Sequence, residues 1–167
     1  VMTSVTDRLR ALIRQRGAIT FAEFMEHVLY AAGGYWARRA RIGEAGDYFT
    51  APHAHPAFGA LIAVQLREFW DRLGRPGEFT AVELGAGDGL LAADITAYLR
   101  RLDPEFAAAL RYVAFDRVAP PAPAYPVMAV EADLQLGGKR AGESSLLATP
   151  PESATGCVLS NELLAAM

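Results

Sequence analysis

The sequence is poor in the features that mark secreted and membrane proteins. Its 167 residues include one cysteine, Cys157, which excludes a disulfide within the chain and suits a reducing compartment. No apolar run approaches the roughly 20 residues that a membrane-spanning helix requires. The first ten residues, V-M-T-S-V-T-D-R-L-R, are polar and lack the apolar segment of a secretion signal. The sequence therefore predicts a cytoplasmic protein without a membrane partner.

Positive charge is also scarce. Lysine and arginine number 16 against 19 aspartate and glutamate residues, which gives a net charge of −3. This balance argues against a nucleic-acid surface held by overall charge, so no nucleic-acid partner is predicted. His53 and His55 form an H-x-H pair, but no cysteine or carboxylate cluster accompanies them at metal-ligand spacing. We therefore predict no metal site.

Apolar residues are abundant enough for one packed core. Hydrophobic residues make up 52% of the chain and charged residues 21%, as in globular proteins. Helical spacing predicts a first helix over 6–16 with Thr6 as its N-cap, and a second over 20–31 that opens with a T-F-A-E capping box. Residues 33–56 contain glycine and proline without a clear period, which predicts a long loop. A third helix is predicted over 56–73.

The most informative stretch is F-T-A-V-E-L-G-A-G-D-G at 79–89. It predicts a buried strand, a glycine turn and a helix with Asp88 as N-cap. Glycines at alternate positions leave main-chain N–H groups accessible to a ligand. Dinucleotide-binding folds use G-x-G-x-x-G, whereas the third glycine here comes one residue early. Glu83 precedes the turn and would repel a pyrophosphate but could pair with an ammonium group. S-adenosylmethionine carries that group and no phosphate.

Further strands complete an α/β pattern. They are predicted at 112–115, 126–130 and 157–160, and Asp116 follows the first of them. This order of strands and helices predicts an α/β fold with a sheet of about four parallel strands. Such a sheet normally continues further, and the last predicted strand begins about ten residues before the chain stops. We therefore interpret the chain as truncated.

Three segments together point to a known family. They are G-D-Y-F-T-A-P-H-A-H-P-A-F-G at 46–59, V-E-L-G-A-G-D-G-L-L-A-A-D-I at 82–95 and S-N-E-L-L at 160–164. With them the chain resembles the MidA-like class I methyltransferases, which include the mitochondrial complex I assembly arginine methyltransferase. The resemblance implies a Rossmann-like seven-stranded sheet, of which this chain would hold an incomplete part. It further implies S-adenosylmethionine as cofactor and a protein substrate, with arginine as acceptor. It also implies an N-terminal helical region with a cofactor-capping loop over 1–75, and half of a cofactor-binding domain over 76–167.

The resemblance assigns a cofactor cradle to five residues. Position by position, it implies that Glu83, Gly85, Ala86 and Gly87 line the methionine end of S-adenosylmethionine. Asp116 stands where the family usually has a glutamate at the end of the second strand. A carboxylate at that place can accept hydrogen bonds from both ribose hydroxyls.

The resemblance also implies a cap and an acceptor side. Gly46, Asp47 and Thr50 belong to the segment that resembles the family's cap over the cofactor. Asn161 and Glu162 follow the last predicted strand, where methyltransferases commonly orient the acceptor. Glu162 would hold the fork of an arginine guanidinium, because carboxylates bind that group with two parallel hydrogen bonds.

Two departures from the family keep alternatives open. The proline-rich residues 117–126 replace a Ser-Pro pair and a helix, and Ala165 replaces an aspartate. The incomplete sheet and Ala165 favour a second hypothesis, a homologue without catalysis that acts as an assembly or binding protein. A third hypothesis is a nicotinamide-dependent oxidoreductase. A sheet that ends at its fourth strand would leave an open edge and an apolar face, which predicts either poor solubility or a homodimer.

Overall fold

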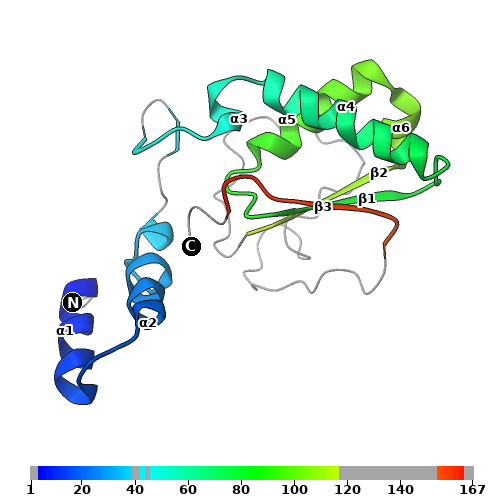
Figure 1. The fold of residues 1–167 in the computed structure, drawn as a ribbon. Coiled ribbons are helices and arrows are strands. Elements are labelled where there is room, and N and C mark those ends of the chain that lie inside the picture. Colours follow the sequence, from blue (N-terminus) through cyan, green and yellow to red (C-terminus); the bar gives the residue numbers. More distant parts are fainter. Residues whose placement is uncertain (1–3, 39–41, 44–45, 117–153, 164–167) are drawn as a thin grey trace. The chain divides into compact units, whose positions relative to one another are not determined.

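The chain forms two compact units in a computed structural model (Figure 1). The structure describes residues 4–38, 42–43, 46–116 and 154–163. One unit runs up to Tyr48 and the other begins at Phe49. This boundary precedes the division at residue 75 that the sequence predicts, and that functional division stays a prediction. Among the described residues, no helix has the length and apolar composition needed to cross a membrane.

The first unit is helical. It contains α1 (Val5–Arg16), α2 (Phe21–Met25), the π-helix η1 (Glu26–Tyr30) and the 3-10 helix η2 (Trp36–Arg38). Ser4 caps α1 by accepting a hydrogen bond from the Asp7 N–H group, so the predicted N-cap Thr6 is wrong. The predicted capping box is confirmed, since Thr20 and Glu23 each accept from the other's backbone N–H group, at 3.2 and 2.9 Å. The predicted second helix then continues as η1.

The second unit is built on a parallel sheet. Its strands are β1 (Phe79–Leu84), β2 (Leu110–Phe115) and β3 (Gly156–Leu159). The order is β2-β1-β3, and both pairings with β1 are parallel. The predicted α/β fold is confirmed, while the strand predicted at 126–130 lies outside the described residues. Because β2 and β3 flank β1 on opposite sides, the chain switches direction across the sheet at the end of β1, where ligands commonly bind.

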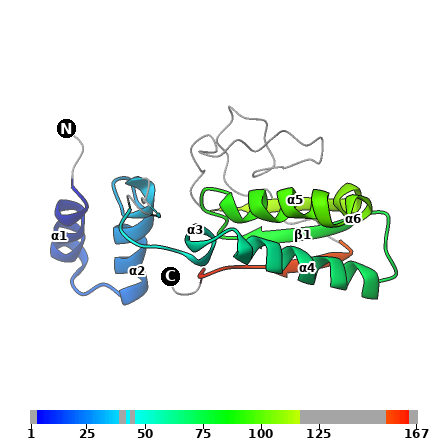
Figure 2. The same cartoon turned by 90° about the horizontal axis from the view of Figure 1, so that it is seen from above.

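Helices of the second unit cover one face of this sheet (Figures 1 and 2). They are α3 (Ala51–Ala54), α4 (Ala57–Arg72), α5 (Leu90–Leu102) and α6 (Pro104–Ala109). α3 lies where the sequence predicts a loop, so that prediction is wrong for four residues. The predicted helix after the glycine turn is α5, but Gly89 takes the N-cap position in place of Asp88. Asp88 still accepts a hydrogen bond from the Leu90 N–H group at 3.1 Å.

Three aromatic rings form the centre of the core between the helices and the sheet. Trp70 of α4, Phe79 of β1 and Phe106 of α6 are buried, with exposed fractions of 2%, 0% and 0%. The indole N–H of Trp70 donates to the backbone carbonyl of Pro76 at 2.8 Å, which satisfies its polar atom. This core fixes α4 and α6 against β1 and so determines where the end of β1 lies.

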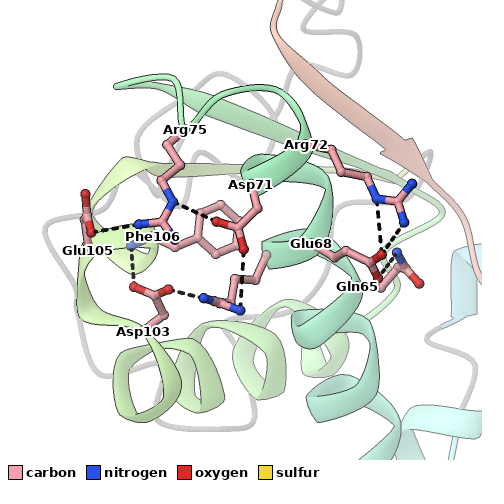
Figure 3. A network of polar contacts seen from close by, with 9 residues as sticks. Gln65, Glu68, Asp71, Arg72, Arg75, Asp103, Glu105 and Phe106 are labelled. Carbon is pink, nitrogen blue, oxygen red and sulfur yellow. Dashed lines mark hydrogen bonds and ion pairs between the residues drawn. The ribbon is translucent and has the colours of Figure 1, made fainter.

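A polar network at the rim of this core joins α4 to α6 (Figure 3). Arg67 donates to Asp103 at 2.8 Å and lies 3.5 Å from Asp71. Arg75 donates to Asp71 at 2.8 Å and lies 3.7 Å from Glu105. The Arg67 guanidinium, together with the Phe106 N–H group, lowers the pKa of Asp103. Most of these side chains are partly exposed, and ion pairs of that kind contribute little each to the free energy of unfolding.

The close crossing of α4 and α5 gives a first testable prediction. A Cβ atom at Gly59 would lie 2.5 Å from the Cβ of Asp94, which is backbone-fixed and cannot turn away. Gly59→Ala should therefore lower the free energy of unfolding by about 1–3 kcal/mol, because overpacking forces the helices apart. Gly77→Ala is the matched control, since nothing lies within 4 Å of its Cβ position. Urea unfolding measures both, and equal stabilities would contradict the close crossing.

Candidate functional site

The glycine turn after β1 has a backbone that L side chains rarely adopt. Gly85, Gly87 and Gly89 have φ values of 76°, 58° and 81°, all in the left-handed region. The N–H groups of Gly85 and Ala86 donate to the Phe115 carbonyl at 2.8 and 3.0 Å, which ties the turn to the end of β2. A Cβ atom at Gly87 or Gly89 would meet nothing within 4 Å. The turn is thus anchored on one side and open on the other.

Asp116 lies beside this turn because β1 and β2 are adjacent and parallel. Its carboxylate Oδ2 accepts a hydrogen bond from the Gly87 N–H group at 2.8 Å. The side chain is half-buried at the carboxyl end of the sheet. The two elements that the sequence assigns to the cofactor, the glycine turn and the carboxylate after β2, therefore meet in the structure.

Glu83 is the buried carboxylate of the site. It is 2% exposed, and its Oε2 atom accepts a hydrogen bond from the Tyr112 hydroxyl at 2.9 Å. Burial raises the pKa of Glu83 to about 7; the Tyr112 hydrogen bond opposes this rise, and the charges of Asp116 and Asp88 add to it. Burial also raises the pKa of Tyr112. A buried carboxylate with a raised pKa gains from a cationic partner, which would favour its ionised form.

A histidine joins α3 to the glycine turn. The Nε2 atom of His53 lies 2.9 Å from Oδ2 of Asp88, and its Nδ1 atom lies 2.8 Å from the Thr50 hydroxyl. The His53 side chain is only 8% exposed. From the sequence alone, His53 is considered only as a metal ligand. No sequence pattern indicates that Asp88, 35 residues away, is its partner. Among the described residues, no three His, Cys, Asp or Glu side chains gather as a metal site would require.

The segment after β3 reaches the same region. Glu162 has a φ of 57°, which is unusual for a residue with a side chain. Its Oε1 atom accepts hydrogen bonds from the Ala51 N–H group at 3.0 Å and from the Asn161 amide at 3.4 Å. Leu163 packs against Gly85, since a Cβ there would lie 2.8 Å from the Leu163 Cδ1 atom. The strand ends of β1, β2 and β3 thus meet at one place.

These contacts bring most of the predicted site residues together. The group comprises Thr50, Glu83, Gly85, Ala86, Gly87, Asp116, Asn161 and Glu162. Gly46 and Asp47 lie in the first unit, where Asp47 accepts a hydrogen bond from the Tyr35 hydroxyl at 2.9 Å. The cofactor role of Gly46 and Asp47 stays a prediction, as do the roles assigned to the grouped residues.

Comparison with known sequences points to methyltransferases. A family model described as "Putative S-adenosyl-L-methionine-dependent methyltransferase" matches residues 61–167. The protein arginine methyltransferase NDUFAF7 of Homo sapiens is 39% identical over 102 residues, which cover 59% of this chain and 23% of that protein. The homolog from Drosophila melanogaster is 39% identical over 106 residues, which cover 62% and 24%. The match therefore spans about a quarter of these relatives.

Comparison with solved structures agrees. A Burkholderia thailandensis protein described as a "likely methyl transferase" was crystallised with S-adenosyl-homocysteine, and it superposes with a TM-score of 0.71 at 27% identity. The superposition covers 96% of this chain and 41% of that one. A native structure from the same organism has a TM-score of 0.66 at 29% identity, covering 98% and 39%. These findings confirm the predicted family and fold.

The same relatives correct one prediction. The human and fly proteins are named as mitochondrial, so the predicted cytoplasmic location is wrong by this comparison. The predicted cofactor is confirmed, because the matching family is S-adenosyl-L-methionine-dependent and one structural relative holds S-adenosyl-homocysteine. The family model covers more than half of the chain. The chain therefore belongs to this family of S-adenosyl-L-methionine-dependent methyltransferases.

Proposed function

We propose that this chain is the cofactor-binding part of a methyltransferase that acts on arginine residues of a protein. The observation that carries this proposal is the meeting of the glycine turn with two carboxylates, Glu83 and Asp116, at the carboxyl ends of parallel strands. The topological switch between β2 and β3 lies at this same place. The names of the human and fly relatives support arginine as the acceptor.

The residues at the turn fit S-adenosylmethionine better than a nucleotide with phosphates. Glu83 is a carboxylate whose ionised form needs a cation, and the ammonium group of the cofactor's methionine supplies one. Asp116 is half-buried beside the turn, where it would accept hydrogen bonds from the ribose hydroxyls. Two carboxylates at this place would repel a pyrophosphate. The open space beyond Gly87 and Gly89 leaves room for a ligand over the backbone.

The acceptor side of the site would be formed by Asn161 and Glu162. Both follow β3 at the carboxyl end of the sheet, where Leu159 of β3 pairs with Glu83 of β1. The left-handed backbone of Glu162 supports a functional role, because strained residues of this kind cluster at active sites. The Glu162 carboxylate also accepts a hydrogen bond from the Ala51 N–H group at the start of α3. This contact positions the Glu162 carboxylate before any acceptor binds.

Methyl transfer would require little chemistry from the protein itself. When bound, S-adenosylmethionine supplies an electrophilic methyl group on its sulfonium, and the residues described here hold and orient the reactants. Glu83 and Asp116 would hold the cofactor at its two ends. Glu162 would hold the guanidinium in place and stabilise its charge.

Binding of S-adenosyl-homocysteine tests this proposal, with Asp116 as the residue to vary. Asp116→Asn keeps an oxygen for the Gly87 N–H group but removes one acceptor for the ribose. We expect calorimetry to show affinity weakened about 10- to 100-fold, since hydrogen bonds to a charged group contribute about 1.5–3 kcal/mol. Asp71→Asn, at the distant α4–α6 network, is the control and should bind as the wild type does.

Two outcomes would count against the proposal. Absence of heat on titration of the wild-type chain with S-adenosyl-homocysteine would contradict the proposal that these residues bind the cofactor. A thermal shift produced by NAD and not by S-adenosyl-homocysteine would favour the oxidoreductase hypothesis instead. Equal affinities of the wild type and Asp116→Asn would leave a methyltransferase whose ribose contact lies elsewhere.

A further inference from the structure

The short helix α3 is held at both ends by residues of the site. Its first N–H group, that of Ala51, donates to Glu162 at 3.0 Å. Its third residue, His53, lies 2.9 Å from Asp88 of the glycine turn. Four residues are too few for a helix to be stable alone, so these contacts define where α3 lies. Through them α3 connects the segment after β3 with the cofactor turn.

The hydrogen bonds of His53 define the tautomer of its neutral ring. A carboxylate oxygen only accepts hydrogen bonds, so the Nε2 atom that faces Asp88 carries a proton. In the neutral ring Nδ1 then has no proton and accepts from the Thr50 hydroxyl, 2.8 Å away. Both ring nitrogens are therefore used, and the imidazole has one orientation. A buried ring held in this way can transmit the position of Thr50 and α3 to Asp88.

Asp88 connects His53 to the backbone of the turn by hydrogen bonds to its two carboxylate oxygens. Its Oδ2 atom faces His53 and its Oδ1 atom accepts from the Leu90 N–H group at 3.1 Å. Asp88 stands between Gly87 and Gly89, both with left-handed φ angles. Glycines on each side leave the backbone many alternative conformations, so a side chain anchored at both oxygens restricts the turn strongly.

We propose that His53 is a positioning residue for the cofactor turn: it fixes the Asp88 carboxylate and thereby holds the turn in the conformation that binds S-adenosylmethionine. This inference rests on the proposed function and adds to it a residue outside the predicted cradle. Three polar groups face the imidazole: Thr50 of the segment before α3, Asp88 of the turn and Asp94 of α5. Within the described residues, the Oδ2 atom of Asp94 is buried without a hydrogen-bond partner.

Two amide variants separate the contacts of the imidazole. Asparagine at position 53 places its amide near the site of Nδ1 and retains the Thr50 contact, whereas glutamine reaches the site of Nε2 and retains the Asp88 contact. We expect His53→Asn to weaken the affinity for S-adenosyl-homocysteine about tenfold and His53→Gln to bind within about twofold of the wild type. His55→Asn is the control, since asparagine can still accept from the Ala57 N–H group as His55 does.

Calorimetry is performed on the 167-residue chain at a temperature where thermal unfolding shows every variant to be folded. A double-mutant cycle with Asp88→Ala then checks the link, because Asp88→Ala should abolish the difference between the two variants at position 53. Equal affinities of His53→Asn and the wild type would overturn the inference. Equal weakening in His53→Asn and His53→Gln would also overturn it, because the Asp88 contact would then carry no special role. Absence of binding by the wild type would overturn the proposed function, and this inference with it.

Discussion

Replacing Phe106 with alanine should lower the free energy of unfolding by about 3–5 kcal/mol. Its side chain is fully buried, and its ring centroid lies 5.0 Å from that of Trp70 and 5.5 Å from that of Phe79. One pair is stacked and the other is edge-on, and each contributes about 0.5–1.5 kcal/mol beyond the buried area. The variant would leave a cavity where α4, α6 and β1 meet.

The control for this prediction is an exposed phenylalanine in the same unit. Phe69 lies on α4 and is 40% exposed, so Phe69→Ala should cost less than about 1 kcal/mol. Thermal unfolding should show a melting temperature about 6–20 °C lower for Phe106→Ala, at about 2–4 °C per kcal/mol for a chain of this size. Similar losses in both variants would mean that the aromatic centre does not hold the unit together.

Local signals in the sequence predicted the parts of the fold that depend on local interactions. The T-F-A-E capping box fixed the start of α2, because both of its hydrogen bonds lie within one helical turn. The glycine turn after β1 is predicted from three glycines at alternate positions, and the structure gives the physical reason for them, since all three have left-handed φ angles that glycine adopts without strain. Asp116 is predicted only to follow the second strand, and it lies beside the turn because β1 and β2 are parallel neighbours that end at the same edge of the sheet.

Contacts between residues distant in the sequence could not be predicted in this way. His53 and Asp88 are 35 residues apart, and Ala51 and Glu162 are 111 apart. No periodicity joins such pairs, and α3 was missed because it forms through these contacts rather than through its own propensity. The hydrogen bond from the Tyr112 hydroxyl to Glu83 is easier to predict once the strands are aligned. Tyr112 pairs with Ala81 in the sheet, so it shares a face with Glu83 one strand away.

Replacing Glu83 with glutamine should make the free protein more stable at pH 8. Its pKa is about 7 in the folded protein against an ordinary value of 4.5, mainly because of burial, so the folded state holds its proton more tightly than the unfolded state does. Stability from this group is therefore greatest below about pH 4.5 and is lost as the pH rises through 7. The two values differ by about 2.5, which corresponds to about 3 kcal/mol.

Urea unfolding at several pH values measures this effect as the difference between the two proteins. Glutamine can still accept the Tyr112 hydrogen bond but carries no charge, so other titrating groups cancel in the comparison. The variant should exceed the wild type by less than about 1 kcal/mol at pH 5 and by about 3 kcal/mol at pH 8. A constant difference across this range would contradict the raised pKa.

The same substitution should have the opposite effect on binding. If Glu83 pairs with the ammonium group of the cofactor, only its ionised form binds well, and with a pKa of about 7 the ionised fraction rises about tenfold from pH 6 to pH 8. The affinity of the wild type for S-adenosyl-homocysteine should rise by the same factor, with proton release visible when calorimetry at pH 7 is repeated in buffers of different ionisation enthalpy. Glu83→Gln should bind more weakly and without this pH dependence.

A Glu83→Gln variant that is more stable and still binds as the wild type does would show that the charge of Glu83 has no role in cofactor binding. A gain in stability together with a loss of affinity is expected when a carboxylate is retained for its function at a cost in stability.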